Sequence, residues 1–146
     1  MLKSIFHTGF VVQDMDKAID FYTRVLGFKF DRFGELSGPP AEQLLGYKDC
    51  HIKVAFLKLD NGHYLELVKY FFPPSVRIDK GLKDIGAAHL GFYIEDMETF
   101  YREKSKLGLR FLNSPMERYI DGKLARRTVM AQDPDGNWLE FIEVLN

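Results

Sequence analysis

Two histidines and two glutamates recur at matching places in two copies of one sequence pattern. Residues 7–15 read His-Thr-Gly-Phe-Val-Val-Gln-Asp-Met, and residues 89–97 read His-Leu-Gly-Phe-Tyr-Ile-Glu-Asp-Met. A second matching segment closes each copy and carries a glutamate. Imidazole nitrogens and carboxylate oxygens are the donors that zinc, nickel, cobalt, manganese and ferrous iron take from proteins. The repeat therefore predicts a site for one divalent metal ion, with these ligands: His7, Glu66, His89 and Glu140.

The start of each copy predicts a strand followed by a helix. Residues 5–12 and 89–94 alternate between apolar and other residues, which is typical of strands. Asp14 and Asp96 follow and can cap a helix. The first helix has one apolar stripe, which consists of Ala18, Phe21, Tyr22, Val25 and Leu26. Gly27 and Gly108 are placed to end the two helices, and short strands resume after them at 28–30 and 109–111.

In each copy, two further strands are predicted after the short strand that follows the helix. Each copy is therefore expected to be a βαβββ module. The expected later strands are 51–59, 64–70, 125–132 and 138–144, and the dipeptides Asn61-Gly62 and Asp135-Gly136 predict the turns. Residues 34–49 read as an excursion with a short helix at 41–45. We expect a single α+β domain over 1–146, built as a cup-shaped mixed sheet from modules 1–70 and 87–146, with residues 71–86 as the linker.

Strand alternation predicts which face the four metal-ligand candidates occupy. The residues on either side of Glu66 and Glu140 are apolar and must face the helices. The candidates then share the opposite face with glycine, valine, tyrosine, tryptophan and isoleucine rather than with lysine or serine. A carboxylate on such a face needs a partner, because burial of an unpaired charge is costly. Gly9 and Gly91, each two residues after a histidine, leave space for an approaching group.

Several other polar residues have simpler explanations. For His51 and His63 we expect surface roles, and for Cys50 no role as a nucleophile. The segment Asp133–Gly136 is explained by turn formation rather than by cation binding. Arg126 and Arg127 are consecutive in a strand, so one of them must lie on the face of the metal-ligand candidates. That arginine can contact an anion or can be a solvated or ion-paired side chain.

Composition limits the classes of partner. The 146 residues are 46% hydrophobic and 28% charged, with a formal net charge of −1, which gives no electrostatic reason to expect nucleic acid or an anionic membrane as a partner. Cys50 is the single cysteine, so no disulfide forms within the chain. No signal-like or membrane-spanning apolar run is present in the sequence. We expect a cytoplasmic protein.

Three segments together resemble the glyoxalase / bleomycin-resistance / extradiol dioxygenase superfamily, also called the vicinal oxygen chelate superfamily. They are the His-x-Gly-Phe-x-x-x-Asp-Met segment, which occurs twice, residues 18–28, and residues 133–140. The resemblance implies two βαβββ modules around one divalent metal, with ligands from the first and last strand of each module. Those positions are again His7, Glu66, His89 and Glu140. The chain is most similar to glyoxalase I (lactoylglutathione lyase), and next to methylmalonyl-CoA epimerase. Val11 and Tyr70 stand where glyoxalase I has arginine and asparagine contacts to glutathione.

The resemblance implies a metal-dependent lyase or isomerase for a small substrate with adjacent oxygens. The reaction would remove a proton next to a carbonyl group, with the metal stabilising the resulting enediolate. Glu140 is the expected base and Glu66 the expected fixed ligand, although either can serve as the acid/base group. The alternatives are an acyl-CoA epimerase, an extradiol-type dioxygenase and a non-catalytic protein that binds a small molecule or drug. We also expect a homodimer, because pairing covers sheet edges and apolar surface.

Overall fold

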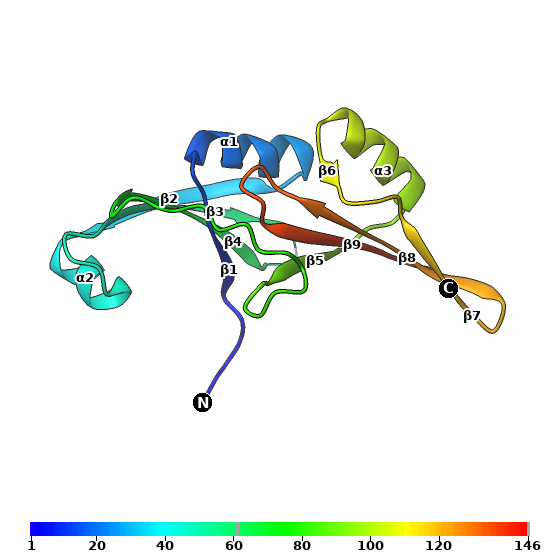
Figure 1. The fold of residues 1–146 in the computed structure, drawn as a ribbon, viewed down its shortest axis with the longest axis horizontal. Helices are drawn as coiled ribbons and strands as arrows, with labels where there is room; N and C mark the ends of the chain where they lie inside the picture. Colours follow the sequence, from blue (N-terminus) through cyan, green and yellow to red (C-terminus); the bar gives the residue numbers. More distant parts are fainter. Residues whose placement is uncertain (61, 146) are drawn as a thin grey trace. The chain divides into compact units, whose positions relative to one another are not determined.

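The computed structural model describes residues 1–60 and 62–145. Among them, the strands form two mixed sheets (Figure 1). The chain divides into two units, Met1–Ile78 and Asp79–Asn146. The first unit contains a four-stranded sheet and the second a five-stranded sheet, among the described residues. This is the α+β class that the sequence predicts.

The first unit follows the predicted βαβββ order and adds one short helix. Its sheet has the order β1 (His7–Val11), β4 (Tyr64–Phe72), β3 (His51–Lys58) and β2 (Lys29–Ser37). Strands β1 and β4 are parallel, and the other neighbours are antiparallel. The helical segment between β1 and β2 consists of α1 (Met15–Asp20) and a π-helical turn, η1 (Phe21–Val25). The additional helix, α2 (Pro39–Leu45), connects β2 to β3 and confirms the short helix predicted at 41–45, with a start two residues earlier.

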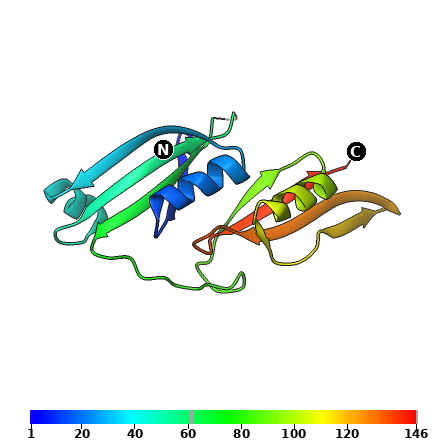
Figure 2. The same cartoon turned by 90° about the horizontal axis from the view of Figure 1, so that it is seen from above.

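The second unit repeats this arrangement with one difference. Its sheet has the order β5 (His89–Tyr93), β9 (Trp138–Val144), β8 (Lys123–Gln132) and β6 (Arg110–Phe111), and β7 (Met116–Ile120) also pairs with β8. Strands β5 and β9 are parallel. Strands β6 and β7 both pair with β8, and together they take the place that the single strand β2 has in the first unit. Figure 2 shows helix α3 (Met97–Lys106) lying over this sheet, as α1 lies over the other.

Capping and apolar spacing explain the two main helices. The Asp14 carboxylate accepts from the backbone N–H of Lys17, and the Asp96 carboxylate accepts from that of Thr99, as the N-cap prediction requires. Four residues of the predicted stripe in the first helix are buried, namely Ala18, Phe21, Tyr22 and Val25. Gly27 (φ +81°) and Gly108 (φ +89°) follow the helices with a backbone conformation that favours glycine.

The structure corrects two local predictions and adds one strand. Residues 34–37 continue strand β2 instead of belonging to an excursion, since they pair in register with residues 51–54. Residues 71 and 72 belong to β4 rather than to the linker. Strand β7 was not predicted at all. The turn predicted at Asn61-Gly62 includes Asn61, which lies outside the described residues. None of the helices among the described residues combines the length and the apolar character that a membrane span needs.

Candidate functional site

In the first unit, the parallel pair β1–β4 places His7 beside Glu66. His7 is in register with Tyr64, and Gly9 with Glu66. Residues in register lie on the same face of a sheet, so His7 and Glu66 share one face. The neighbours of Glu66, Leu65 and Leu67, are fully buried on the other face, as predicted. We call the face with His7 and Glu66 the ligand face of the first unit.

The second unit reproduces this arrangement residue for residue. Gly91 is in register with Glu140, and the neighbours of Glu140, Leu139 and Phe141, are buried. The distance from His7 Nε2 to Glu66 Oε2 is 3.2 Å, and the distance from His89 Nε2 to Glu140 Oε2 is 3.3 Å. The face of this unit that carries His89 and Glu140 is its ligand face.

These distances fit two donors on one metal ion. Ligand atoms that are each about 2.1 Å from an ion, at an angle of roughly 90–110°, lie about 3.0–3.4 Å apart. A neutral imidazole nitrogen and a carboxylate oxygen are also a suitable donor set for zinc, nickel, cobalt, manganese or ferrous iron. The same separation suits a hydrogen bond or an ion pair when the imidazole carries the proton. Each pair therefore supplies two donors toward a metal site.

The glycines beside the two glutamates make room for their carboxylates. A Cβ atom at Gly9 would lie 3.3 Å from Glu66 Oε2, and one at Gly91 would lie 3.6 Å from Glu140 Oε2. The Glu66 carboxylate thus crowds the space that a larger residue at position 9 would fill, whereas the contact at position 91 would be an ordinary one. That these glycines also leave space for an approaching group stays a prediction.

No larger ligand cluster forms among residues 1–60 and 62–145. No three of their His, Cys, Asp and Glu side chains are grouped so that they could hold a metal ion. The structure brings together the two predicted pairs, one in each unit, and the four-ligand site stays a prediction.

Aromatic side chains surround the histidine–glutamate pair of the first unit. Phe56 is in register with Glu66 on β3. The ring centroids of Phe6 and His7 are 4.9 Å apart, and those of Phe56 and Tyr64 are 5.9 Å apart. The guanidinium of Arg32 lies 4.4 Å from the centroid of the Phe56 ring. A hydrogen bond with Tyr64, and a second with Asp31, raise the pKa of Arg32. Lys58, in register with Tyr64, also lies on this face. The ligand face is therefore lined by rings and by two cations, and the Glu66 side chain is 19% exposed.

Helix α2 covers one end of the same face. Ala41, Cys50 and Ile52 form a buried apolar cluster, against which Val68 and Tyr70 pack. Burial raises the pKa of the Tyr70 hydroxyl. Cys50 is fully buried in this cluster, where a thiol behaves as a small apolar group. The expectation that it is no nucleophile agrees with this position.

The other polar residues considered from the sequence contact polar groups outside the two histidine–glutamate pairs. His51 Nε2 is 2.6 Å from Glu35 Oε1, and His63 Nε2 is 3.0 Å from Thr8 Oγ1. The buried Asp133 carboxylate accepts from the backbone N–H groups of Asp135 and Asn137, which is the turn chemistry that the sequence indicates.

The structure distinguishes the two consecutive arginines on β8. Arg127 is in register with Glu143, which is buried on the side of α3, and it forms ion pairs with three carboxylates: Glu98, Glu117 and Glu143. Arg126 is in register with Val144 and therefore lies on the ligand face. Arg118 and Thr128 also lie on this face, although neither is predicted from the sequence to be a site residue. The signal that could have found Arg118 was a strand at 116–120, opposite 123–128.

The fold agrees with comparisons to known proteins. The model of the glyoxalase/bleomycin resistance protein/dioxygenase superfamily matches residues 4–141. The chain therefore belongs to this superfamily.

One curated relative and two solved structures illustrate the similarity. A 2-epi-5-epi-valiolone epimerase from Actinomyces sp is 27% identical over 146 residues, which cover 97% of this chain and 79% of that protein. A glyoxalase family protein from Bacillus cereus has a TM-score of 0.86 at 19% identity, covering all of this chain and 97% of its own. The trypanothione-dependent glyoxalase I of Leishmania major has a TM-score of 0.65 at 21% identity, over 97% of this chain and 87% of its own. The two structures support the fold.

Proposed function

We propose that this protein is a metal-dependent lyase or isomerase of the glyoxalase I type, which removes a proton next to a carbonyl group and returns it. The observation that carries the proposal is the repeated pair of histidine and glutamate, with the same register and with separations of 3.2 and 3.3 Å. Two unrelated surface ion pairs have no physical reason to match so closely. A shared function of the two pairs gives that reason.

In this proposal one divalent ion takes two donors from each unit: His7 and Glu66 from the first, His89 and Glu140 from the second. Two imidazoles and two carboxylates leave two positions of an octahedral ion for a substrate with adjacent oxygens. The two units can belong to one chain or to two copies of it. The identity of the metal is open among zinc, nickel, cobalt, manganese and iron.

The chain's own residues would carry out the proton transfer. When bound, the metal supplies a Lewis acid that stabilises the negative charge developing on the substrate oxygen. Glu140 takes the proton from the carbon next to the carbonyl group and delivers it again, and Glu66 holds its position as a ligand. An epimerase among the relatives supports this chemistry, because epimerisation next to a carbonyl group uses the same proton removal and return.

Pairing of two copies would complete the assembly. Strands β1 and β2 are the edges of the first sheet, and Phe30 and Phe33 expose 42% and 48% of their surface near one edge. Association covers open edges and apolar surface of this kind. We therefore propose a homodimer. Sedimentation equilibrium at micromolar concentration should give twice the mass of the chain, and a monomer would contradict this part of the proposal.

Metal content and turnover test the proposed function. The purified protein should contain a stoichiometric divalent metal, and chelation should abolish turnover in a screen of hemithioacetals, 2-substituted acyl thioesters and catechols. Turnover of a catechol alone would favour the oxygenase alternative. His7→Ala and His89→Ala should each lower metal retention. His51→Ala is the matched control, because it also removes an imidazole beside a carboxylate but should leave the metal in place. An equal loss of bound metal in all three variants, or the absence of metal from the wild-type protein, would refute the proposal.

A further inference from the structure

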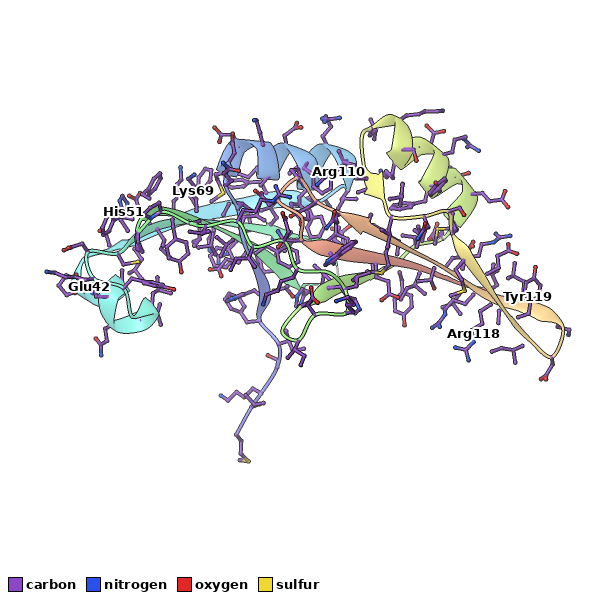
Figure 3. The ribbon with its side chains drawn as sticks, viewed as in Figure 1. Glu42, His51, Lys69, Arg110, Arg118 and Tyr119 are labelled. Carbon is purple, nitrogen blue, oxygen red and sulfur yellow. The ribbon has the colours of Figure 1, made fainter. Side chains whose placement is uncertain are left out.

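Arg118 and Arg126 face each other across two strands of the second unit without a carboxylate between them. They are directly in register in the antiparallel pair β7–β8. Figure 3 shows the Arg118 side chain on the side of the hairpin away from α3, which is the ligand face of this unit. Like charges in direct register repel each other. Such a pair is retained when something else neutralises it.

Arg127, which is next to Arg126 in the chain, is surrounded by carboxylates, whereas Arg118 and Arg126 are not. Arg127 has three carboxylates on the other face of β8. Within the described part of the chain, neither Arg118 nor Arg126 forms an ion pair. On the other side of Arg126 the residue in register is Val144. Glu140, whose carboxylate also lies on the ligand face, is in register with Met130 on β8, four positions away from Arg126.

Two buried polar atoms near the arginine pair also lack a partner. Arg126 Nε and Thr128 Oγ1 are both inaccessible to solvent, and neither has a hydrogen-bond partner among the described residues. Thr128 is two residues from Arg126, so both side chains lie on the ligand face. Buried donors without an acceptor are rare in folded proteins. Together with the opposed guanidinium groups, these atoms form a set of donors that has no acceptor.

We infer that Arg118, Arg126 and Thr128 form a subsite for one anionic group of the substrate, a phosphate or a carboxylate. Guanidinium groups bind such oxygens through paired, charge-assisted hydrogen bonds. An anion between Arg118 and Arg126 neutralises their repulsion by binding the terminal guanidinium nitrogens, and the buried Arg126 Nε and Thr128 hydroxyl donate to it once their side chains turn toward it. The sequence leaves open whether one of the two consecutive arginines contacts an anion, and the structure assigns that role to Arg126.

The position of the subsite limits the length of the substrate. Met130, Thr128 and Arg126 form a row on the ligand face that leads away from Glu140. Four residues of a strand span about 13 Å at roughly 3.3 Å per residue. The assignment of the anion to the substrate rests on the proposed function, with Glu140 at the reacting carbon. The substrate is then an elongated molecule with its anionic group about 10 Å or more from that carbon, rather than a compact neutral one.

Titration of the full-length protein with inorganic phosphate tests the subsite directly. The Nε–H resonances of the arginine side chains report which guanidinium groups respond, and acetate in a parallel titration distinguishes a phosphate site from a carboxylate site. Phosphate can also bind a metal, so the titration uses chelator-treated protein. Arg118 and Arg126 should shift saturably with millimolar phosphate or acetate. The absence of a saturable shift with either anion, or equal shifts of all arginines, would overturn the inference.

Matched variants make the test specific. Arg126→Gln should weaken binding by about tenfold or more, and Thr128→Val, which keeps the side-chain shape, by several fold. Arg102→Gln is the control, because it removes the same charge from an exposed arginine of α3 and should leave the affinity unchanged. An equal loss in the control would contradict the subsite. Loss of the dimer in Arg126→Gln, without phosphate binding in the wild type, would instead assign Arg126 to a contact between copies.

The phosphate titration tests the subsite and the metal assay tests the proposed function, and a negative result in one does not decide the other. Phosphate binding to chelator-treated protein needs no metal, so a protein without metal content can still show the subsite. Conversely, a metal-dependent enzyme that binds no anion here keeps the proposed function and loses the inference. Once a substrate is found, Arg126→Gln should raise KM with little change in kcat, because the contact is remote from the reacting carbon.

Discussion

Gly9 lies directly opposite Glu66 in the parallel pair β1–β4, and a Cβ atom at position 9 would come within 3.3 Å of Glu66 Oε2. Gly91 has the same relation to Glu140, with a distance of 3.6 Å. A parallel neighbour normally presents its side chain beside the residue in register. The missing side chain therefore lets each carboxylate lie across the first strand of its unit, beside the histidine two residues earlier.

The two glycines should respond differently to alanine. At Gly9 the added methyl group is closer to the carboxylate than an ordinary contact, so Glu66 must move by a few tenths of an ångström. At Gly91 the contact is ordinary. Groups that position a metal ligand typically change metal affinity by about 10–100-fold, and we expect Gly9→Ala to weaken metal binding by about tenfold at the lower end of that range. Competition with a chromogenic chelator measures both variants. Greater loss in Gly91→Ala would contradict this explanation.

The separation of base and ligand predicts different kinetics for the two glutamates. Glu140→Gln keeps an oxygen donor but removes the proton acceptor, so the variant should retain appreciable metal while kcat falls by roughly 10²–10⁴-fold. Glu66→Gln should mainly lower metal affinity, and excess metal should restore much of its activity. Metal titrations with parallel kcat measurements separate the two effects. Equal losses of kcat at saturating metal would refute the asymmetric assignment and leave the metal site itself standing.

The sequence predicts the elements that depend on local patterns. The N-caps at Asp14 and Asp96, the apolar stripe of the first helix and the strand 138–144 follow from capping and from periodicity, and the structure has them. The continuation of β2 through Gly34 could not be predicted in the same way. Gly34 lies against Val54, where an added Cβ would be within 2.9 Å of the valine side chain. The tertiary contact, rather than strand propensity, explains a glycine inside this strand.

For the candidate site, the repeat predicts the pairs and alternation predicts their face. A single sequence does not show which residue on a distant strand lies opposite a given residue. Arg118 became notable only because β7 places it opposite Arg126, and β7 has no apolar alternation to reveal it. The three carboxylates that hold Arg127 come from α3, β7 and β9, so the choice between the two arginines needed the fold.

Arg126 and Arg127 should have opposite roles in stability and binding. Arg127→Gln leaves Glu143, which is 5% exposed, without its cation, and removal of one partner from a buried ion pair is destabilising. The melting temperature of this variant should fall by several degrees. Arg126→Gln removes a charge that faces another arginine, so its melting temperature should stay near that of the wild type. Differential scanning calorimetry without added anion measures both. A larger decrease for Arg126→Gln would show that its side chain has a structural partner.

The hydrogen bonds of Glu117 predict a pH-dependent contribution to stability. The Tyr119 hydroxyl donates to Glu117 at 2.9 Å, and Arg127 Nε donates to it at 3.0 Å. These two bonds, that of Tyr119 first, lower the pKa of the Glu117 carboxyl below its ordinary 4.5. The folded protein thus favours the charged form. The contribution is complete above the unfolded pKa and is lost as the pH falls through the lower, folded pKa.

Comparison of the wild type with Glu117→Gln tests this dependence, because glutamine resembles the protonated carboxyl. The wild type should be the more stable protein at neutral pH, and the difference should shrink progressively below about pH 4.5. Urea unfolding at several pH values measures the difference in the free energy of unfolding. Tyr119→Phe removes the hydrogen bond with the largest effect on this pKa, so it should reproduce part of the loss at neutral pH. A difference that is the same at every pH would mean that Glu117 acts through its shape rather than its charge.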